Sequence, residues 1–320
     1  MSRESKDIRR LVEVARLYYE SGLTQERIAH LLHLSRPTVQ RMVRASREQG
    51  IVLISIHDPL DTQKTLESQL QASFELERAV VVPTVQGDPE ATKARVGEAG
   101  ARYLETLLGK KGTLAVSWGT TVGEVAKALR PVRLPEIRVV QMLGDSGLAT
   151  RADDTFRAIA DRLGAQAITL PAPALEKNPS ARRLLRLSSH IQEVFRILGE
   201  AQIALTGVGP VSEEATSVKR GHVIEDEMRR LAKAGAVGEI NTKFYDRFGR
   251  PIRSFNKQII GMDLDEICRI PRIITVASDG PGKAAAVLGA MRGHYIKVLI
   301  TDESLARQVL ASQAVQVRKL

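Results

Sequence analysis

Apolar and polar residues alternate along this chain in two different patterns. Up to about residue 58 the spacing predicts three helical stretches and then a short strand, 51–56, which the dipeptide Asp58-Pro59 ends. The next stretch starts at Thr62 and predicts a connecting helix with one apolar stripe. The residues of the stripe recur at four-residue spacing: Leu66, Leu70 and Phe74. Such a stripe either docks on a neighbouring surface or forms a dimer interface.

Beyond the connecting helix, short apolar runs alternate with helical segments to the end of the chain. The runs cover 79–83, 113–117, 137–141, 167–170, 203–206, 273–276 and 296–300. Apolar runs separated by helices indicate a parallel sheet that is covered on both faces. We therefore predict an α/β protein with two domains. Residues 1–58 form a winged helix-turn-helix, and residues 59–320 form a larger Rossmann-like domain with a parallel sheet.

Two capped helices joined by a short turn are predicted within the first domain. Thr24 is a favourable N-cap for the first helix, whose apolar face carries Ile28 and Leu31. Ser35 caps the second helix, which runs from about residue 36 to residue 48 and stops before Gly50. This pair is a helix-turn-helix, and the strand after it is a candidate wing.

The turn between these helices departs from the common pattern of the motif. His33 occupies the position where glycine is usual. Histidine tolerates a left-handed backbone better than most residues do, although less well than glycine, so the turn remains feasible.

The second helix carries side chains that suit DNA. Val39 and either Met42 or Val43 face the core, which leaves polar residues outside. We predict that Arg36, Thr38, Gln40 and Arg41 read base edges and that Arg44 and Arg47 contact phosphates. With the caps included, the predicted DNA-binding residues are Thr24, Gln25, Ser35, Arg36, Thr38, Gln40, Arg41, Arg44 and Arg47. The alternative is a helical hairpin with solvated arginines that mediates protein contacts.

The charge balance and the single cysteine narrow the choice of partners. Lysine and arginine number 47 against 37 aspartates and glutamates, a net charge of +10 that attracts nucleic acid or phosphorylated metabolites. Cys268 cannot close an intramolecular disulfide and fits no metal spacing, which favours a reducing, cytoplasmic compartment and predicts no metal or other cofactor. No apolar run reaches the roughly 18 residues of a membrane span, so no membrane partner is expected.

Two strand-to-helix turns are candidates for anion binding. In a parallel sheet, ligands collect beyond the carboxyl ends of the strands, where helix N-termini offer backbone N–H groups. Gly119, Thr120 and Thr121 form the first turn, in which two hydroxyls are available to a phosphate. Gly280 and Lys283 lie in the second turn, and Lys283 adds a positive charge. Together the two turns could hold one phosphate; the alternative for each is ordinary turn chemistry.

An enzymatic role for the larger domain has little support in the sequence. Catalysis needs a general base or a nucleophile with a partner. The histidines are scattered and show no metal spacing: His30, His33, His57, His190, His222 and His294. We therefore predict no enzyme; the alternative is a sugar-phosphate isomerase-like enzyme with an appended helical module.

Segments along nearly the whole chain resemble, in order, the landmarks of the SorC family of bacterial sugar-responsive transcriptional regulators. In the first domain they are 17–29 and 34–39; further on they are 117–121, 170–174, 207–209, 236–239, 244–246 and 298–302. The resemblance implies a regulator of a carbohydrate or polyol operon that binds operator DNA and forms a dimer or tetramer. It also implies an effector domain similar in fold to sugar-phosphate isomerases, whose ligand is a sugar, a polyol or a phosphate of either.

The resemblance also implies roles for individual residues. It places the segments that carry Thr120 and Lys283 near the effector's phosphate. Some relatives hold, at the position of Leu143, a lysine that forms a Schiff base, so covalent capture is not expected here. Gly144 and Asp145 follow, and Asp145 stands where relatives often have glycine; we expect it to tune the preference for a hydroxyl pattern.

Asp246 is a further candidate for binding ligand hydroxyls. It falls in a hairpin-like turn, so an Asx-turn is the alternative role for its carboxylate.

Overall fold

The computed structural model describes residues 3–49, 51–52, 62–145 and 155–317, with side chains from 8 to 314 within those ranges. Its internal contacts divide the chain into two units, Met1–Asp58 and Pro59–Leu320, which we call the helical unit and the effector unit. Within the described ranges, no helix is long and apolar enough to cross a membrane.

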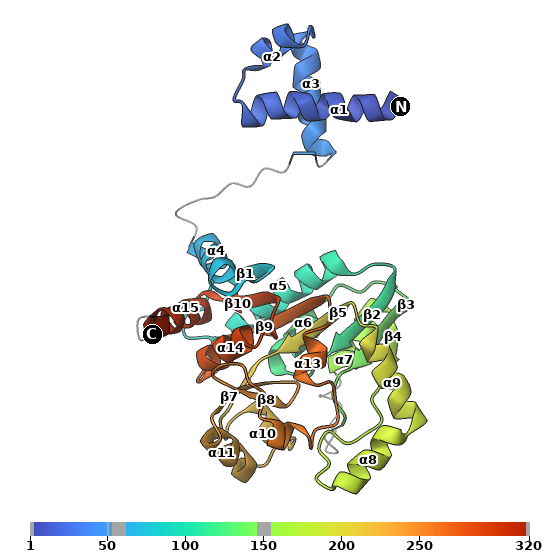
Figure 1. Ribbon diagram of the computed structural model, residues 1–320, viewed down its shortest axis with the longest axis vertical. Helices are drawn as coiled ribbons and strands as arrows, with labels where there is room; N and C mark the ends of the chain where they lie inside the picture. Colours follow the sequence, from blue (N-terminus) through green and yellow to red (C-terminus); the bar gives the residue numbers. More distant parts are fainter. Residues whose placement is uncertain (1–2, 50, 53–61, 146–154, 318–320) are drawn as a thin grey trace. The chain divides into compact units, whose positions relative to one another are not determined.

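The helical unit is built from α1 (Arg3–Ala15), a π-helical turn η1 (Arg16–Glu20), α2 (Gln25–Leu31) and α3 (Arg36–Glu48) (Figure 1). Both α1 and α2 contact α3. Their apolar faces meet in one buried core, formed by Val14, Ile28, Ala29, Val39 and Val43. The predicted boundaries of the second helix of the pair are confirmed.

The turn between α2 and α3 has the predicted left-handed residue. His33 has a φ angle of 53°, and Leu34 N donates to Ala29 O at 2.8 Å behind it. The expectation that Leu31 shares the buried face is wrong, because its side chain is 54% exposed. The helix ends at Leu31, and the turn directs the partly buried Leu32 and Leu34 toward the core instead.

The predicted wing lies largely outside the described residues. Ile51 and Val52 form a bend, in which Val52 N donates to Ser46 O at 2.9 Å. Gly50 and the rest of the predicted strand are not described.

A seven-stranded parallel sheet forms the centre of the effector unit, in the order β1-β10-β9-β5-β2-β3-β4. In chain order the strands are β1 (Arg78–Val82), β2 (Lys111–Val116), β3 (Glu136–Gln141), β4 (Gln166–Ile168), β5 (Ile203–Gly207), β9 (Arg272–Ala277) and β10 (Val298–Asp302). Each predicted apolar run therefore lies in this sheet, and the α/β prediction is confirmed.

Helices cover both faces of the sheet. One face packs on α5 (Pro89–Leu107), α6 (Thr120–Ala128) and α7 (Thr155–Leu163). The other packs on α4 (Thr62–Phe74), α9 (Ser189–Gly199), α13 (Leu264–Ile267), α14 (Lys283–Arg292) and α15 (Glu303–Val317). Strand residues alternate between the two cores: Leu114 and Val116 join the first, and Ala115 the second.

The connecting helix α4 docks on the effector sheet rather than standing apart. Leu66 and Leu70 are buried in the second core, next to Phe74. The buried carboxylate of Glu67 accepts a hydrogen bond from Val81 N of β1 at 3.0 Å. α4 also contacts α15, and Figure 1 shows these two helices beside β1. The apolar stripe is therefore used within the chain.

A second, antiparallel sheet was not anticipated from the sequence. It consists of β6 (Gly209–Pro210), β7 (Ala236–Ile240) and β8 (Lys243–Asp246). It is accompanied by the helices α8 (Pro179–Leu187), α10 (Thr216–Lys219), α11 (Glu225–Lys233) and α12 (Arg253–Asn256). A third apolar core lies here, and two residues from the ends of parallel strands, Trp118 and Leu143, belong to it.

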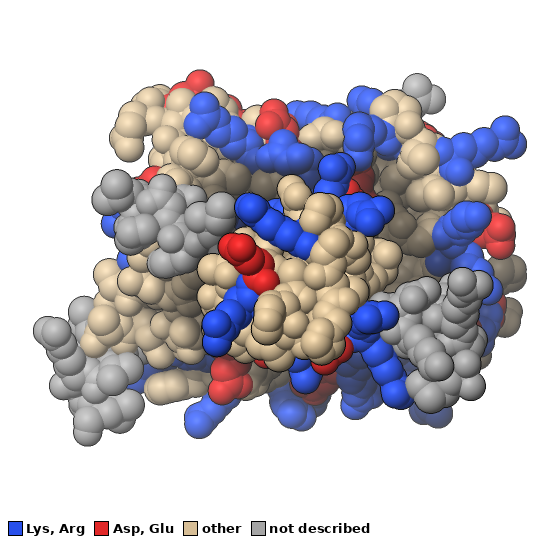
Figure 2. Space-filling view, turned by 90° about the horizontal axis from the view of Figure 1, so that it is seen from above, with Lys and Arg blue, Asp and Glu red and all other residues tan. Residues whose placement is uncertain are grey.

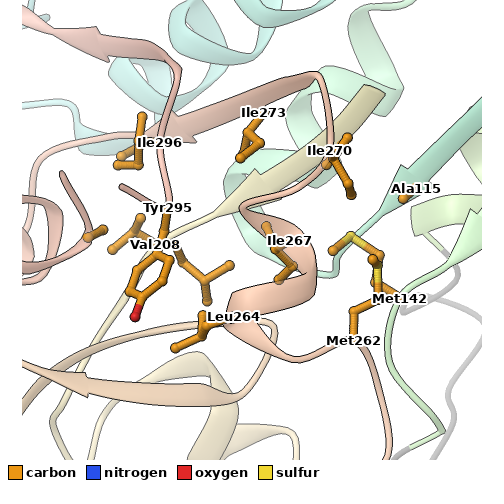
Figure 3. Close-up of a cluster of buried hydrophobic side chains, with 14 of the residues drawn as sticks. Ala115, Met142, Val208, Met262, Leu264, Ile267, Ile270, Ile273, Tyr295 and Ile296 are labelled. Atoms are coloured by element: carbon orange, nitrogen blue, oxygen red, sulfur yellow. The ribbon is translucent and has the colours of Figure 1, made fainter. Parts of the chain in front are cut away.

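Buried side chains from the strand ends join the sheet to the loops above it. Figure 3 shows Met142, directly after β3, beside Met262, which precedes α13. The backbone oxygens of both residues accept hydrogen bonds from Asn241 Nδ2, at 3.1 and 3.3 Å. The turn between β7 and β8 is thus fixed against the carboxyl ends of the parallel strands.

Candidate functional site

The exposed face of α3 carries the predicted DNA-binding side chains. Arg36, Gln40, Arg41, Arg44 and Arg47 are exposed and, at 3.6 residues per turn, span an arc of about 140° on the side away from the core. Thr38 is half-buried beside them. Figure 2 shows lysine and arginine side chains in several separate groups among other residues, with a few acidic side chains between them. The arginines of α3 thus form one exposed basic face on the helical unit, which is available to a duplex.

Two N-caps fix the ends of α2 and α3. Thr24 Oγ1 accepts from Arg27 N at 3.3 Å, and Ser35 Oγ accepts from Thr38 N at 3.3 Å. The hydroxyls of Ser35 and Thr38 lie 2.7 Å apart and are hydrogen-bonded. Gln25 is half-buried in the first turn of α2. Both helix N-termini still offer backbone N–H groups and a partial positive charge to phosphates.

Arg44 has an intramolecular partner on the same helix. Its Nε lies 2.8 Å from Glu48 Oε1, and both side chains are mostly exposed. Exposed ion pairs of this kind are weak, so a DNA phosphate can replace Glu48.

Four of the five predicted anion-binding residues, all except Gly280, meet in a cavity at the carboxyl ends of the parallel strands. Thr120 and Thr121 line it from the start of α6, and Lys283 lines it from the start of α14. Gly119, with φ 151°, adopts a backbone that favours glycine and so lets the chain turn from β2 into α6. The cavity has a volume of about 50 Å³, enough for a few water molecules.

A stack of side chains separates this cavity from a second one of the same size. Trp118 lines both cavities, its ring stacks on that of His222 at 4.5 Å, and the Arg220 guanidinium lies 5.6 Å from its centroid. Gly144 and Asp145 line the second cavity. A ligand of sugar size requires the two cavities to merge, because small-molecule sites usually exceed about 300 Å³.

A buried carboxylate faces the Lys283 cavity. Glu239 of β7 is 4% exposed, and its Oε2 has no hydrogen-bond partner among the described residues. Burial raises the pKa of Glu239 to about 7, against the opposing effects of Ser217, Lys283 and Thr242. Burial also lowers the pKa of Lys283 to about 8, although Glu239 counteracts it, and Lys283 Nζ donates to Val208 O.

The turn between β7 and β8 supplies further polar groups. Asn241 and Thr242 have φ angles of 55° and 57°, an uncommon backbone for a β-branched residue such as threonine. Ser117 Oγ donates to Asn241 Oδ1 at 3.3 Å, and Trp118 Nε1 donates to Thr242 Oγ1 at 3.2 Å. Backbone strain of this kind often marks a functional site.

Two predicted effector residues lie apart from this cavity. Gly280 does not line it, and its N–H donates to Asp279 Oδ1 at 2.7 Å. Asp246 Oδ1 accepts from Phe248 N and Arg250 N at 2.8 and 2.9 Å, which is the alternative Asx-turn role. Asp246 also packs near Gly289, about 9 Å along α14 from Lys283.

The sequence did not point to five residues that the structure places at the candidate site: Glu239, Asn241, Thr242, Arg220 and His222. Glu239 had a detectable signal, because it is a single carboxylate within the apolar run 236–240. His222 had none, since its partner Trp118 is more than a hundred residues away.

Comparisons with known proteins agree with this architecture. The family described as "Putative sugar-binding domain" matches residues 58–311, and a homeodomain-like domain family matches residues 5–53. The deoxyribonucleoside regulator of Bacillus subtilis (strain 168) is 32% identical over 97% of this chain and 99% of its own. The transcriptional regulator LsrR of Klebsiella pneumoniae is 30% identical, covering 94% of this chain and 92% of its own.

A solved structure has a similar fold. The crystal structure of the full-length sorbitol operon regulator SorC from Klebsiella pneumoniae has a TM-score of 0.71 and 28% identity, over 95% of this chain and 99% of that one. These relatives are regulators, which favours a regulator over the isomerase-like alternative and agrees with the prediction of no enzyme. The chain belongs to the SorC family of DNA-binding transcriptional regulators with a sugar-binding domain.

Proposed function

We propose that the effector of this regulator is a phosphorylated sugar or polyol, bound where Trp118 separates the two cavities. The observation that carries the proposal is the position of Lys283. Its side chain lines the same cavity as Thr120 and Thr121, at the N-termini of α6 and α14. Two helix N-termini, two hydroxyls and one cation form a site for a phosphoryl group.

The rest of the ligand has its own partners in this proposal. Glu239, one of whose carboxylate oxygens has no hydrogen-bond partner among the described residues, accepts hydrogen bonds from sugar hydroxyls. Asp145 lines the second cavity, where it discriminates among hydroxyl patterns. The names of the relatives, which refer to deoxyribonucleosides and to the sorbitol operon, support a sugar or polyol.

In the same proposal, the protein acts on operator DNA as a dimer or tetramer in the cytoplasm. Helix-turn-helix modules commonly bind two half-sites in pairs, with the second helix of each in the major groove. The effector then shifts an equilibrium between arrangements of the paired helical units by its difference in affinity for them.

The test is a ligand panel measured on the full chain by thermal shift and calorimetry. Sugars, polyols and their phosphates are compared for the wild type, Lys283→Gln and the exposed control Lys233→Gln. We expect one phosphorylated compound to stabilise the wild type and Lys233→Gln, and to bind Lys283→Gln about tenfold or more weakly, because a charge-assisted hydrogen bond is lost. Stabilisation by unphosphorylated polyols alone, unchanged in Lys283→Gln, would contradict the phosphate site.

A further inference from the structure

A groove separate from the effector cavities lies on the effector unit between α8 and the segment that carries α12 and α13. It has a volume of about 530 Å³ and shares no lining residue with the cavities around Trp118. This volume lies in the range of small-molecule sites. The floor and walls include the apolar residues Pro179, Leu187, Pro251 and Leu264.

Basic side chains stand on both walls of the groove. Arg182, Arg183 and Arg186 come from α8, while Arg253 and Lys257 come from α12 and the residue after it. The guanidinium of Arg182 is fixed, since it donates to the carbonyl oxygens of Glu176 and Lys177 at 2.8 and 3.3 Å.

The acidic residues of the groove do not balance these cations. Asp263 and Asp265 line it, but Asp263 is 2.6 Å from the ammonium of Lys243. Lys243 is fully buried and also donates to the carbonyl oxygens of Asn256 and Ile259. The pKa of Lys243 is lowered mainly by burial and also by the positive charge of Arg186. The charge of Arg186 is therefore felt at this buried ammonium group.

Most of the groove's cations have no ion-pair partner. Within the described part of the chain this holds for Arg183, Arg186, Arg253 and Lys257. Elsewhere on the same unit arginines are paired, as in Arg130–Glu105, Arg196–Glu193, Arg272–Glu77 and Arg307–Glu303. Cations of one sign gathered in a concave surface focus the electrostatic potential and attract an anion.

We propose that this groove binds a small organic anion with at least two phosphate or carboxylate groups. Arginine recognises both groups through paired hydrogen bonds, and cations on two facing walls require two anionic groups on one ligand. The apolar residues between the walls then contact the body of the ligand. This site does not depend on the effector site, because the two share no residue.

The experiment measures binding of inorganic pyrophosphate and citrate to the full chain by calorimetry. Orthophosphate serves as the comparison ligand, because it has only one phosphate group. The test variant is Arg186→Gln combined with Lys257→Gln, and Arg183→Gln with Arg253→Gln repeats it. The matched controls are Arg269→Gln, for an exposed arginine outside the groove, and Lys283→Gln, for the effector cavity.

We expect pyrophosphate or citrate to bind the wild type more tightly than orthophosphate, and both groove variants to lose about tenfold or more in affinity while the controls do not. An equal loss of affinity in Arg269→Gln would mean that the anions respond to the net charge of the protein and not to the groove. A loss in Lys283→Gln instead would place the anion in the effector cavity. Binding of polyglutamate without binding of either small anion would replace the small ligand by a protein partner, and each of these results overturns the proposal.

Discussion

A carboxylic acid and an ammonium group share one buried cavity in the effector unit, and their pKa values move in opposite directions. The pKa of Glu239 is raised from 4.5 to about 7 by burial, and that of Lys283 is lowered from 10.5 to about 8. Around them, Lys93 adds a positive charge near Lys283, and Ser217 and Thr242 face Glu239. The pKa values of both side chains therefore lie close to neutral pH.

These shifts predict how stability depends on pH. Between pH 4.5 and 7 the folded chain keeps a proton on Glu239 that the unfolded chain releases, so the free energy of unfolding falls by up to about 3 kcal/mol as pH rises. Between pH 8 and 10.5 the unfolded chain holds the extra proton, on Lys283, so stability rises with pH. We expect urea titrations followed by circular dichroism to show the decline in the wild type and a flatter profile in Glu239→Gln.

Glu193 provides a control of opposite sign. Arg196 lowers the pKa of this exposed carboxyl, so Glu193→Gln removes a contribution that is lost as pH falls, not as it rises. An unchanged decline between pH 4.5 and 7 in Glu239→Gln would show that another group carries it.

Only some of the residues that line the candidate site could be predicted from the sequence. Thr120, Thr121 and Lys283 line the cavity as predicted, because they follow apolar runs at strand-to-helix turns and that rule uses adjacent residues only. Glu239 was missed although its place within the apolar run 236–240 was a signal, because that signal does not show which cavity the carboxylate faces. Gly280 was expected at the cavity, but its N–H donates to the carboxylate of Asp279. That carboxylate also accepts hydrogen bonds from Ser304 and Gln308 of α15.

Among the elements, α3 was predicted most completely. The cap Ser35, the arginine face and the helix ends follow from local sequence rules. The β7–β8 hairpin was missed because its turn, Asn241–Thr242, lacks the glycine that usually marks a turn of this kind. Tertiary hydrogen bonds to Ser117, Met142 and Met262 hold that turn, and a reading of adjacent residues cannot detect them.

Arginines at different positions of α3 should have separable effects on DNA binding. We expect Arg41→Ala to lower the preference for operator over random duplex, by about 1–3 kcal/mol where a bidentate base contact is lost. We expect Arg47→Ala to weaken both duplexes equally and to reduce the slope of log affinity against log salt by about 1. Binding assays over a salt series measure both quantities. Equal loss on both duplexes for Arg41→Ala would refute the division of roles.

On the scale of the whole molecule, the two units hold their cores independently. Among the described residues, the helical unit has one apolar core and the effector unit has three, one of which includes the docked helix α4. The cavities around Trp118 and the basic groove lie wholly within the effector unit.

A fragment of residues 59–320 should therefore fold and bind as the full chain does. Its three apolar cores and all the cavity residues are retained, so we expect effector affinity within about twofold of the full chain, with no binding to operator DNA. Calorimetry and a gel-shift assay check the two halves of this prediction. A loss of effector affinity in the fragment would mean that the helical unit contributes to the site.

Trp118 is the only tryptophan of the chain and stands between the two effector cavities. Its indole N–H is hydrogen-bonded to Thr242, and one ring face is stacked on His222. Because a ligand that joins the cavities must disturb these contacts, its arrival changes the emission of this single fluorophore. The chain thus contains an intrinsic optical reporter, with which stopped-flow mixing can time effector entry without a label.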